Sequence, residues 1–166
     1  MLVIGIDPGT ALTGFGLVRR APDAALHLID YGVIRTSSSQ SMSRRLVKLH
    51  NDLEALLQRY QPDQAAVERL FFQKNVTTAI SVGQARGVVL LALATAGLAI
   101  EEYTPQDIKM AVTGYGAADK GQMQRMVQML LTMDDLPKPD DAADALAVAI
   151  CHANSAALQA RIEDLE

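Results

Sequence analysis

Short apolar runs dominate the first third of the chain and predict strands. The run at residues 2–6 ends at Asp7 and the turn-forming pair Pro8-Gly9, so it predicts a buried strand followed by a turn. Residues 13–18 and 25–34 continue in the same way. Together these three segments predict an antiparallel meander.

Helical spacing of leucines begins after these strands. Five leucines share one face between Ser43 and Tyr60, opposite charged side chains, and predict the first helix: Leu46, Leu49, Leu53, Leu56 and Leu57. Residues 65–68 then predict a short strand that ends on Glu68. Residues 75–96 predict a long helix rich in small side chains.

One more strand and further helices complete the pattern. Residues 100–103 predict a fifth strand, and Thr104-Pro105-Gln106-Asp107 is typical of a helix start, because Thr caps, Pro fits the first turn and Asp complements the dipole. A later helix carries a Met-rich stripe over residues 123–133, which indicates core packing. The whole pattern predicts an α/β fold, in which parallel strands extend the meander into a mixed five-stranded sheet flanked by helices.

Composition favours a single domain. With 166 residues and 49% hydrophobic content the chain can bury one sizeable core, and we place this domain at residues 1–154. The polar segment 155–166 is expected to be loosely ordered. A single Cys, Cys151, excludes a disulfide within the chain. We find no signal-like segment and no apolar run that we interpret as a membrane span, so we expect a cytoplasmic protein with no membrane partner.

Charge is distributed unevenly along the chain. The net charge is −4, but residues 1–133 carry 13 basic and 11 acidic side chains, a net +2, whereas residues 134–166 carry 2 and 8, a net −6. Between Arg69 and Ile100 there are three bases and no acid. This stretch is able to meet phosphate, although scattered bases are also common on ordinary solvated surfaces.

Four acidic residues stand where their chemistry is informative. Asp7 and Glu68 each end an apolar strand, and Asp141 and Asp144 share one face of a predicted helix. Clustered carboxylates repel one another unless a cation neutralises them, and hard divalent ions prefer oxygen ligands. Taken singly, each acid has a simpler interpretation as a helix cap, a turn hydrogen bond or an ion pair with Arg69. In combination they predict a metal site.

Four short motifs occur in order over nearly the whole chain: Ile4-Gly5-Ile6-Asp7-Pro8-Gly9, Val67-Glu68-Arg69-Leu70-Phe71, Gly83-Gln84-Ala85-Arg86-Gly87 and Asp141-Ala142-Ala143-Asp144-Ala145-Leu146-Ala147. Together they resemble the RuvC family of bacterial Holliday-junction resolvases. The resemblance implies an RNase H-like fold, a homodimer, and an endonuclease that cuts four-way DNA junctions at two symmetric points during recombination and repair.

The same resemblance implies the cofactor and the catalytic residues. It makes Asp7, Glu68, Asp141 and Asp144 both the catalytic and the metal-binding residues, with two Mg²⁺ per active site and Mn²⁺ able to substitute. Some relatives have His at the position of Asp141, which affects metal preference. The branch-migration proteins RuvA and RuvB are implied as further partners.

DNA contacts are also implied. The resemblance selects Phe71 as a wedge at the junction centre. Phe71 and Phe72 would point to opposite sides of an extended segment, so either can be the exposed ring. Lys109 and Lys120 match basic residues that face DNA in the family. Three more bases are expected to contact DNA: Arg69, Lys74 and Arg86.

Two other classes of protein remain possible at this point. Residues 4–10 also look like the first phosphate loop of actin-like ATPases and sugar kinases, whose domains share this core. Such proteins bind a nucleotide between two domains, and the chain has no second glycine-rich phosphate loop. A junction-binding scaffold without hydrolysis is the other alternative, and the four acids argue against it.

Overall fold

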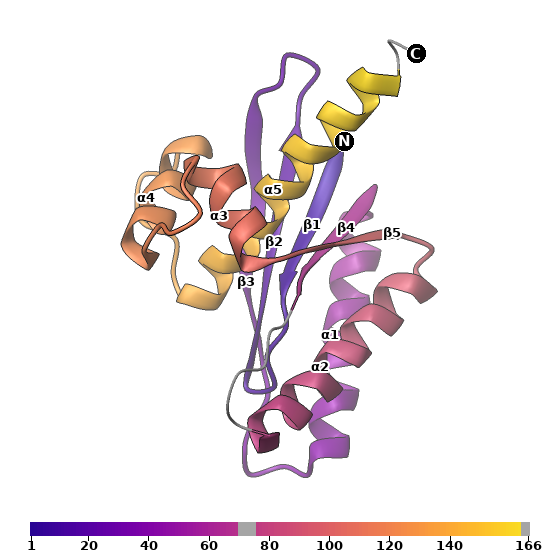
Figure 1. The fold of residues 1–166 in the computed structure, drawn as a ribbon. Coiled ribbons are helices and arrows are strands. Elements are labelled where there is room, and N and C mark those ends of the chain that lie inside the picture. Colours follow the sequence, from indigo (N-terminus) through magenta and orange to yellow (C-terminus); the bar gives the residue numbers. More distant parts are fainter. Residues whose placement is uncertain (70–75, 164–166) are drawn as a thin grey trace.

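The structure, a computed structural model, describes residues 1–69 and 76–163. These parts contain five strands and five helices (Figure 1). The predicted elements are confirmed, with small shifts at their ends. The strands are β1 (Leu2–Asp7), β2 (Leu12–Arg20), β3 (Leu26–Arg35), β4 (Gln64–Glu68) and β5 (Ala99–Tyr103), and the helices are α1 (Met42–Tyr60), α2 (Val76–Thr95), α3 (Pro105–Thr113), α4 (Lys120–Leu130) and α5 (Asp140–Glu163).

All five strands form one mixed sheet, in the order β3-β2-β1-β4-β5. The first three are antiparallel neighbours, whereas β4 lies parallel to β1 and β5 lies parallel to β4. The predicted meander with added parallel strands is therefore confirmed. Both faces of the central strand β1 are apolar, because Val3 faces one core and Ile4 and Ile6 face the other.

Helices cover both faces of this sheet. In Figure 1, α1 and α2 lie on one side, and α3, α4 and α5 lie on the other. The leucine face of α1 is buried at Leu49, Leu53 and Leu57, as its spacing predicts. The start of α3 is a capping box, in which Thr104 and Asp107 each accept a hydrogen bond from the other's backbone N–H.

Helix α5 packs directly against the backbone of β1 and β2, because glycines leave no side chains between them. A Cβ added at Gly5 would lie 2.3 Å from the carbonyl oxygen of Ala145, and one at Gly14 would lie 1.9 Å from that of Asp141. Gly16 meets α5 in the same way. Since no side chain fits at these positions, the helix and the sheet are held at a fixed, short separation.

Cys151 and His152 are buried in α5, where His152 contributes to packing against the sheet. The Nδ1 atom of His152 lies 2.9 Å from the Tyr103 hydroxyl, and its Nε2 atom lies 2.9 Å from Oε1 of Gln64. These bonds tie α5 to β4 and β5. Burial lowers the pKa of His152 and raises the pKa of Cys151 to about 11, so both groups are neutral at physiological pH.

The helix α5 continues past residue 154, the predicted end of the domain. Its helical backbone reaches Glu163, so residues 155–163 are a continuation of α5 and not a segment without secondary structure. The looseness of this polar stretch stays a prediction.

One stretch of α2, Thr78–Thr95, is long and apolar enough to cross a membrane by length and composition, with a mean hydropathy of 1.4. Only 22% of it is buried. Its exposed apolar side chains include Ile80, 59% exposed, and Leu91, 60% exposed. A helix whose apolar side packs against another protein can have the same length and hydropathy.

Candidate active site

Parallel pairing of β1 and β4 brings the first two acids together. Ile6 pairs with Val67 in the register of these strands, and Asp7 and Glu68 are the next residue of each strand. The carboxyl ends of adjacent parallel strands lie at the same edge of a sheet, so both acids stand at that edge. The two carboxyl groups are close enough for each to affect the pKa of the other.

The glycine contact between β2 and α5 brings the other two acids to the same place. Gly14 is the β2 residue paired with Asp7, and its missing Cβ lets the Asp141 backbone lie directly on it. Asp144 follows three positions later on α5, close to one turn along the same face. The ends of β1 and β4 and the start of α5 therefore lie close together, and whether the four acids act as one site stays a prediction.

The electrostatics of Asp7 reveal how close these charges are. Burial raises the pKa of Asp7 from 3.8 to about 8, and the negative charges of Glu68, Asp144 and Asp141 add to this rise, in that order. At neutral pH Asp7 is therefore mostly protonated. The site carries more negative charge than its surroundings neutralise.

Burial also raises the pKa values of Glu68 and Asp144, and nearby lysines oppose this rise. Burial, then the charge of Asp144, raises the pKa of Glu68, while Asp7 and the charge of Lys109 act against this. Burial also raises the pKa of Asp144, opposed by the nearby Lys120. Each lysine thus stabilises one carboxylate of the cluster in its charged form.

Both lysines share a cavity with two of the acids. The cavity has a volume of about 230 Å³, and its lining includes Glu68, Asp144, Lys109 and Lys120. Lys120 Nζ lies 3.9 Å from Oδ2 of Asp144. Two acids and two bases therefore meet in one depression, as expected where a charged substrate group enters.

A further acid, Asp140, lies beside this site, although the sequence analysis did not single it out. Its Oδ2 atom lies 2.9 Å from Lys120 Nζ, and its Oδ1 atom accepts a hydrogen bond of 2.8 Å from Gln124 Nε2. Both groups lower the pKa of Asp140, Lys120 more than Gln124. The adjacent pair of aspartates was the only signal in the sequence, and it does not reveal a partner 20 residues away.

Two of the other predicted DNA contacts, Arg86 and Arg69, form ion pairs with Glu102. Arg86 Nη2 lies 2.5 Å from Oε1 of Glu102, and Arg69 Nε lies 3.6 Å from the other oxygen of the same carboxylate. Arg86 is the less exposed of the two and is held in this structural pair, whereas Arg69 remains half exposed. Their DNA contacts stay predictions. Phe71, Phe72 and Lys74 lie outside the described residues.

The four carboxylates have the right chemistry for a hard cation but are not preassembled around one. Among the residues that the structure describes, no three His, Cys, Asp or Glu side chains stand so that they could hold a metal ion. Nevertheless, Asp7 experiences the charges of all three partners. Carboxylate oxygens are the ligands that Mg²⁺ and Mn²⁺ prefer, so the donor set fits such an ion once the side chains turn towards it.

Comparison with known proteins supplies the family. The chain matches the family described as "Crossover junction endodeoxyribonuclease RuvC" over residues 3–152. The chain belongs to the RuvC family. It is 55% identical to the RuvC protein of Roseiflexus sp. (strain RS-1) over 161 residues, which are 97% of this chain and 95% of that relative.

Solved structures of the RuvC family agree with this assignment. Thermus thermophilus RuvC matches with a TM-score of 0.88 and 35% identity, covering 96% of this chain and 97% of its own. Thermus thermophilus RuvC in complex with a Holliday junction substrate matches with a TM-score of 0.87 and 33% identity, covering 95% and 96%.

Family membership confirms two predictions, the RNase H-like fold and the activity of a Holliday-junction-resolving endonuclease. A nucleotide-binding domain of the actin-like or sugar-kinase type is not favoured. A junction-binding scaffold without catalysis is not favoured either.

Proposed function

We propose that the protein cuts four-way DNA junctions by metal-dependent hydrolysis, with Asp7, Glu68, Asp141 and Asp144 as the metal-binding and catalytic residues. The observation that carries this proposal is geometric: Asp7 and Glu68 end two adjacent parallel strands, and the Asp141 backbone lies on Gly14, the strand partner of Asp7. Burial and the charges of the other three acids accordingly raise the pKa of Asp7. A buried cluster of like charges is costly unless a cation joins it. The metal is Mg²⁺, two ions per site, with Mn²⁺ able to take its place.

The side chains of the site have separate tasks in this proposal. When bound, the metal supplies Lewis-acid stabilisation of the scissile phosphate and an activated water. Asp7 has to release its proton before it and Glu68 can both act as ligands. Lys109 and Lys120 line the same cavity and are placed to neutralise phosphate oxygens as the backbone enters. No covalent bond between protein and DNA is required.

The remaining DNA contacts are proposed from the resemblance to RuvC. Phe71 is the proposed wedge at the junction centre, with Phe72 as its alternative. Arg69 follows the Glu68 strand end directly in the sequence and is a proposed contact to the DNA strand next to the cut, and Lys74 is proposed from the resemblance alone. Arg86 is a weaker candidate because Glu102 already pairs with it.

A homodimer is proposed through the exposed side of α2. Ile80, Gly83, Gly87, Leu91 and Ala94 follow one another at intervals of three and four residues, the spacing of a helix-to-helix seam. All five are exposed, and a Cβ at either glycine would meet nothing within 4 Å. Small residues let a second helix approach closely. A two-fold dimer would place two active sites on a junction that is cut at two symmetric points.

RuvA and RuvB remain proposed partners, and the cytoplasm the proposed location. Both follow from the resemblance to bacterial RuvC proteins. The dimer seam on α2 offers an explanation for its exposed apolar side that requires no membrane.

A direct test compares three activities of the wild-type protein. A four-way junction is incubated with and without Mg²⁺, nicked duplex products are resolved on a gel, and ATP turnover is measured in parallel. We expect symmetric nicks only with the metal and no ATP turnover. Junction binding without nicks at saturating Mg²⁺ or Mn²⁺ would contradict the proposal and favour the scaffold, and ATP turnover would favour the nucleotide-binding domain.

A further inference from the structure

A second basic surface lies outside the candidate active site. Residues 31–51 contain four basic side chains and no acid, although the chain as a whole has a net charge of −4. One is at the end of β3 and three are in the first two turns of α1. We call them the α1 basic patch, and they are Arg35, Arg44, Arg45 and Lys48.

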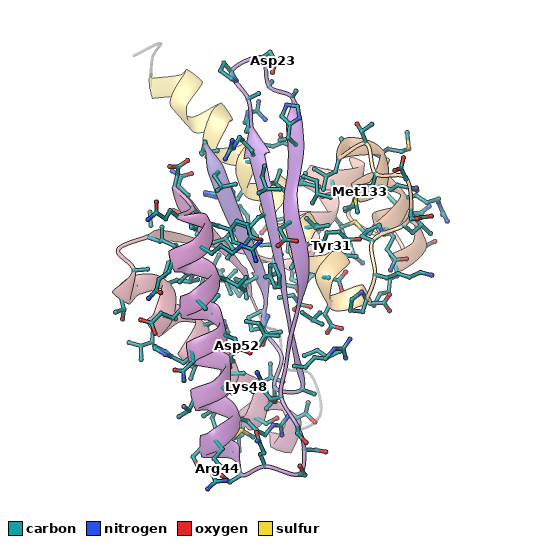
Figure 2. All side chains as sticks on the ribbon, turned by 180° about the vertical axis from the view of Figure 1, so that it is seen from behind. Asp23, Tyr31, Arg44, Lys48, Asp52 and Met133 are labelled. Carbon is teal, nitrogen blue, oxygen red and sulfur yellow. The ribbon has the colours of Figure 1, made fainter. Side chains whose placement is uncertain are left out.

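The members of the α1 basic patch lie on one continuous surface. Arg35 and Lys48 line the same groove between β3 and α1, which has a volume of about 520 Å³. Figure 2 shows Arg44 and Lys48 one after the other along the start of α1, at the end of the molecule opposite Asp23. Lys48 forms an ion pair with Asp52 at 2.6 Å. Arg45 keeps its charge, but it is half-buried and its Nε donates a hydrogen bond of 2.9 Å to Thr36 Oγ1.

Arg35 and Arg44 are therefore the members of the patch most accessible to an approaching phosphate. Both are exposed. Arg44 also stands in the first turn of α1, where there is no acid and where the side chain of the N-cap residue Ser41 makes no capping hydrogen bond. A positive side chain at the positive end of a helix is unfavourable by itself and becomes favourable when an anion lies nearby.

Hydrogen bonds connect this surface to the active-site end of the sheet. Thr36 follows Arg35 directly, its N–H donates to the carbonyl oxygen of Ala11 at 3.0 Å, and its hydroxyl donates to that of Thr10 at 2.5 Å. The segment of residues 8–11 joins Asp7 to β2. A DNA duplex whose phosphate reaches Asp7 can thus continue across Arg35 and Arg44.

We propose that the α1 basic patch, through Arg35 and Arg44, binds the phosphate backbone of a duplex arm of the junction beyond the point of cutting. This inference rests on the proposed function, because it takes four-way DNA as the substrate. Duplex DNA has one negative charge per roughly 1.7 Å of its axis, so an arm presents phosphates to any basic surface along its path. The contact is independent of base sequence, and it holds the arm in a fixed direction relative to the cut.

Salt titration of junction affinity tests the patch. Full-length protein binds a long-armed, fluorescently labelled four-way junction in Ca²⁺ buffer, and the dissociation constant is measured by anisotropy at several salt concentrations. Arg35→Ala combined with Arg44→Ala should flatten the log-log salt slope by about 1.8, since each lost phosphate contact contributes about 0.9. Arg35→Lys combined with Arg44→Lys should keep most of the slope, because the charges remain.

A matched control and a footprint locate the effect. Arg19→Ala removes an exposed arginine of β2 whose strand partner is Leu2, at the end of the sheet away from Asp7, and should leave the slope unchanged. Phosphate ethylation interference should show arm phosphates, away from the cut, that matter for the wild type and not for the double alanine variant. An unchanged slope, or equal flattening by Arg19→Ala, would overturn the patch. Absence of nicking by the wild type would instead overturn the proposed function, so the two failures are distinguishable.

Discussion

Asp7 and Glu68 are the last residues of two adjacent parallel strands, close enough that the charge of Glu68 adds to the rise of the Asp7 pKa. Two buried carboxyl groups this close titrate as a pair, and a like charge opposes the loss of the second proton. One proton is therefore held by the pair at neutral pH. A divalent cation would replace this proton, and the predictions for the site follow from that exchange.

Asp7→Asn should reduce junction nicking about 100-fold or more, because metal ligation supplies several kcal/mol of transition-state stabilisation. Junction affinity should change by no more than a few-fold, since an amide keeps the size of the side chain. Gel-based cleavage rates and anisotropy measure the two quantities. Asp23→Asn, at the exposed turn between β2 and β3, is the matched control. Full cleavage by the Asp7 variant at saturating Mg²⁺ would refute the assignment, and the same test applies to Glu68.

The stability of the metal-free protein should depend on Asp7 and on pH. Its pKa rises from 3.8 to about 8 on folding, so the folded state binds this proton more tightly than the unfolded chain does. The Asp7 carboxyl therefore destabilises the fold increasingly as pH rises from about 4 to about 8, at 1.36 kcal/mol per pH unit as an upper limit. Denaturant unfolding should show Asp7→Asn more stable than wild type at pH 8, by about 2–5 kcal/mol, and equal to it near pH 4. Parallel pH profiles would contradict the assigned shift.

Gly14→Ala should damage both the fold and the site. The new methyl group would overlap the carbonyl of Asp141, so the first turn of α5 would have to move away from Asp7. We expect a loss of about 3 kcal/mol or more in the free energy of unfolding, from forced overpacking. Gly121→Ala is the control, because its Cβ would meet mainly the end of a flexible Arg125 side chain. Equal unfolding midpoints for the two variants would show that α5 does not depend on this contact.

Lys120→Ala should weaken junction binding in a salt-dependent way. The lysine lies between Asp140 and Asp144, beside the cavity where phosphate would enter. Loss of one phosphate contact flattens the log-log salt slope by about 0.9. Arg125→Ala removes an exposed base from the same helix and should leave the slope as it is. A wild-type slope for the Lys120 variant would leave the lysine as a partner of aspartates alone.

Ile80→Glu combined with Leu91→Glu should convert the proposed dimer into monomers. Both side chains are exposed on the apolar side of α2, and facing charges in a helix-to-helix seam repel one another. Analytical ultracentrifugation at micromolar concentration measures the change. Met129→Glu alters another exposed apolar side chain, on α4, and should leave the dimer intact. A monomeric wild-type protein at that concentration would contradict the proposal.

Much of the fold was predictable because local signals and the global fold agree. The leucine spacing of α1 and the capping box at Thr104 and Asp107 are local features, and both elements form as predicted. The placement of Asp7 and Glu68 at strand ends followed from the apolar runs before them. Ion pairs between residues far apart in the chain could not be predicted from the sequence. Lys120 with Asp140 and Arg86 with Glu102 depend on how helices and strands approach one another, and no periodicity in the sequence encodes that approach.

The sequence by itself determined which acids are present, where each strand and helix begins, and the family to which the chain belongs. Only the tertiary structure decided how these acids affect one another. The Asp141 backbone rests on Gly14, and burial with three neighbouring charges raises the pKa of Asp7 to about 8. The physical reason is that propensity and hydrophobic periodicity act over a few residues, whereas desolvation and charge repulsion depend on distances through space.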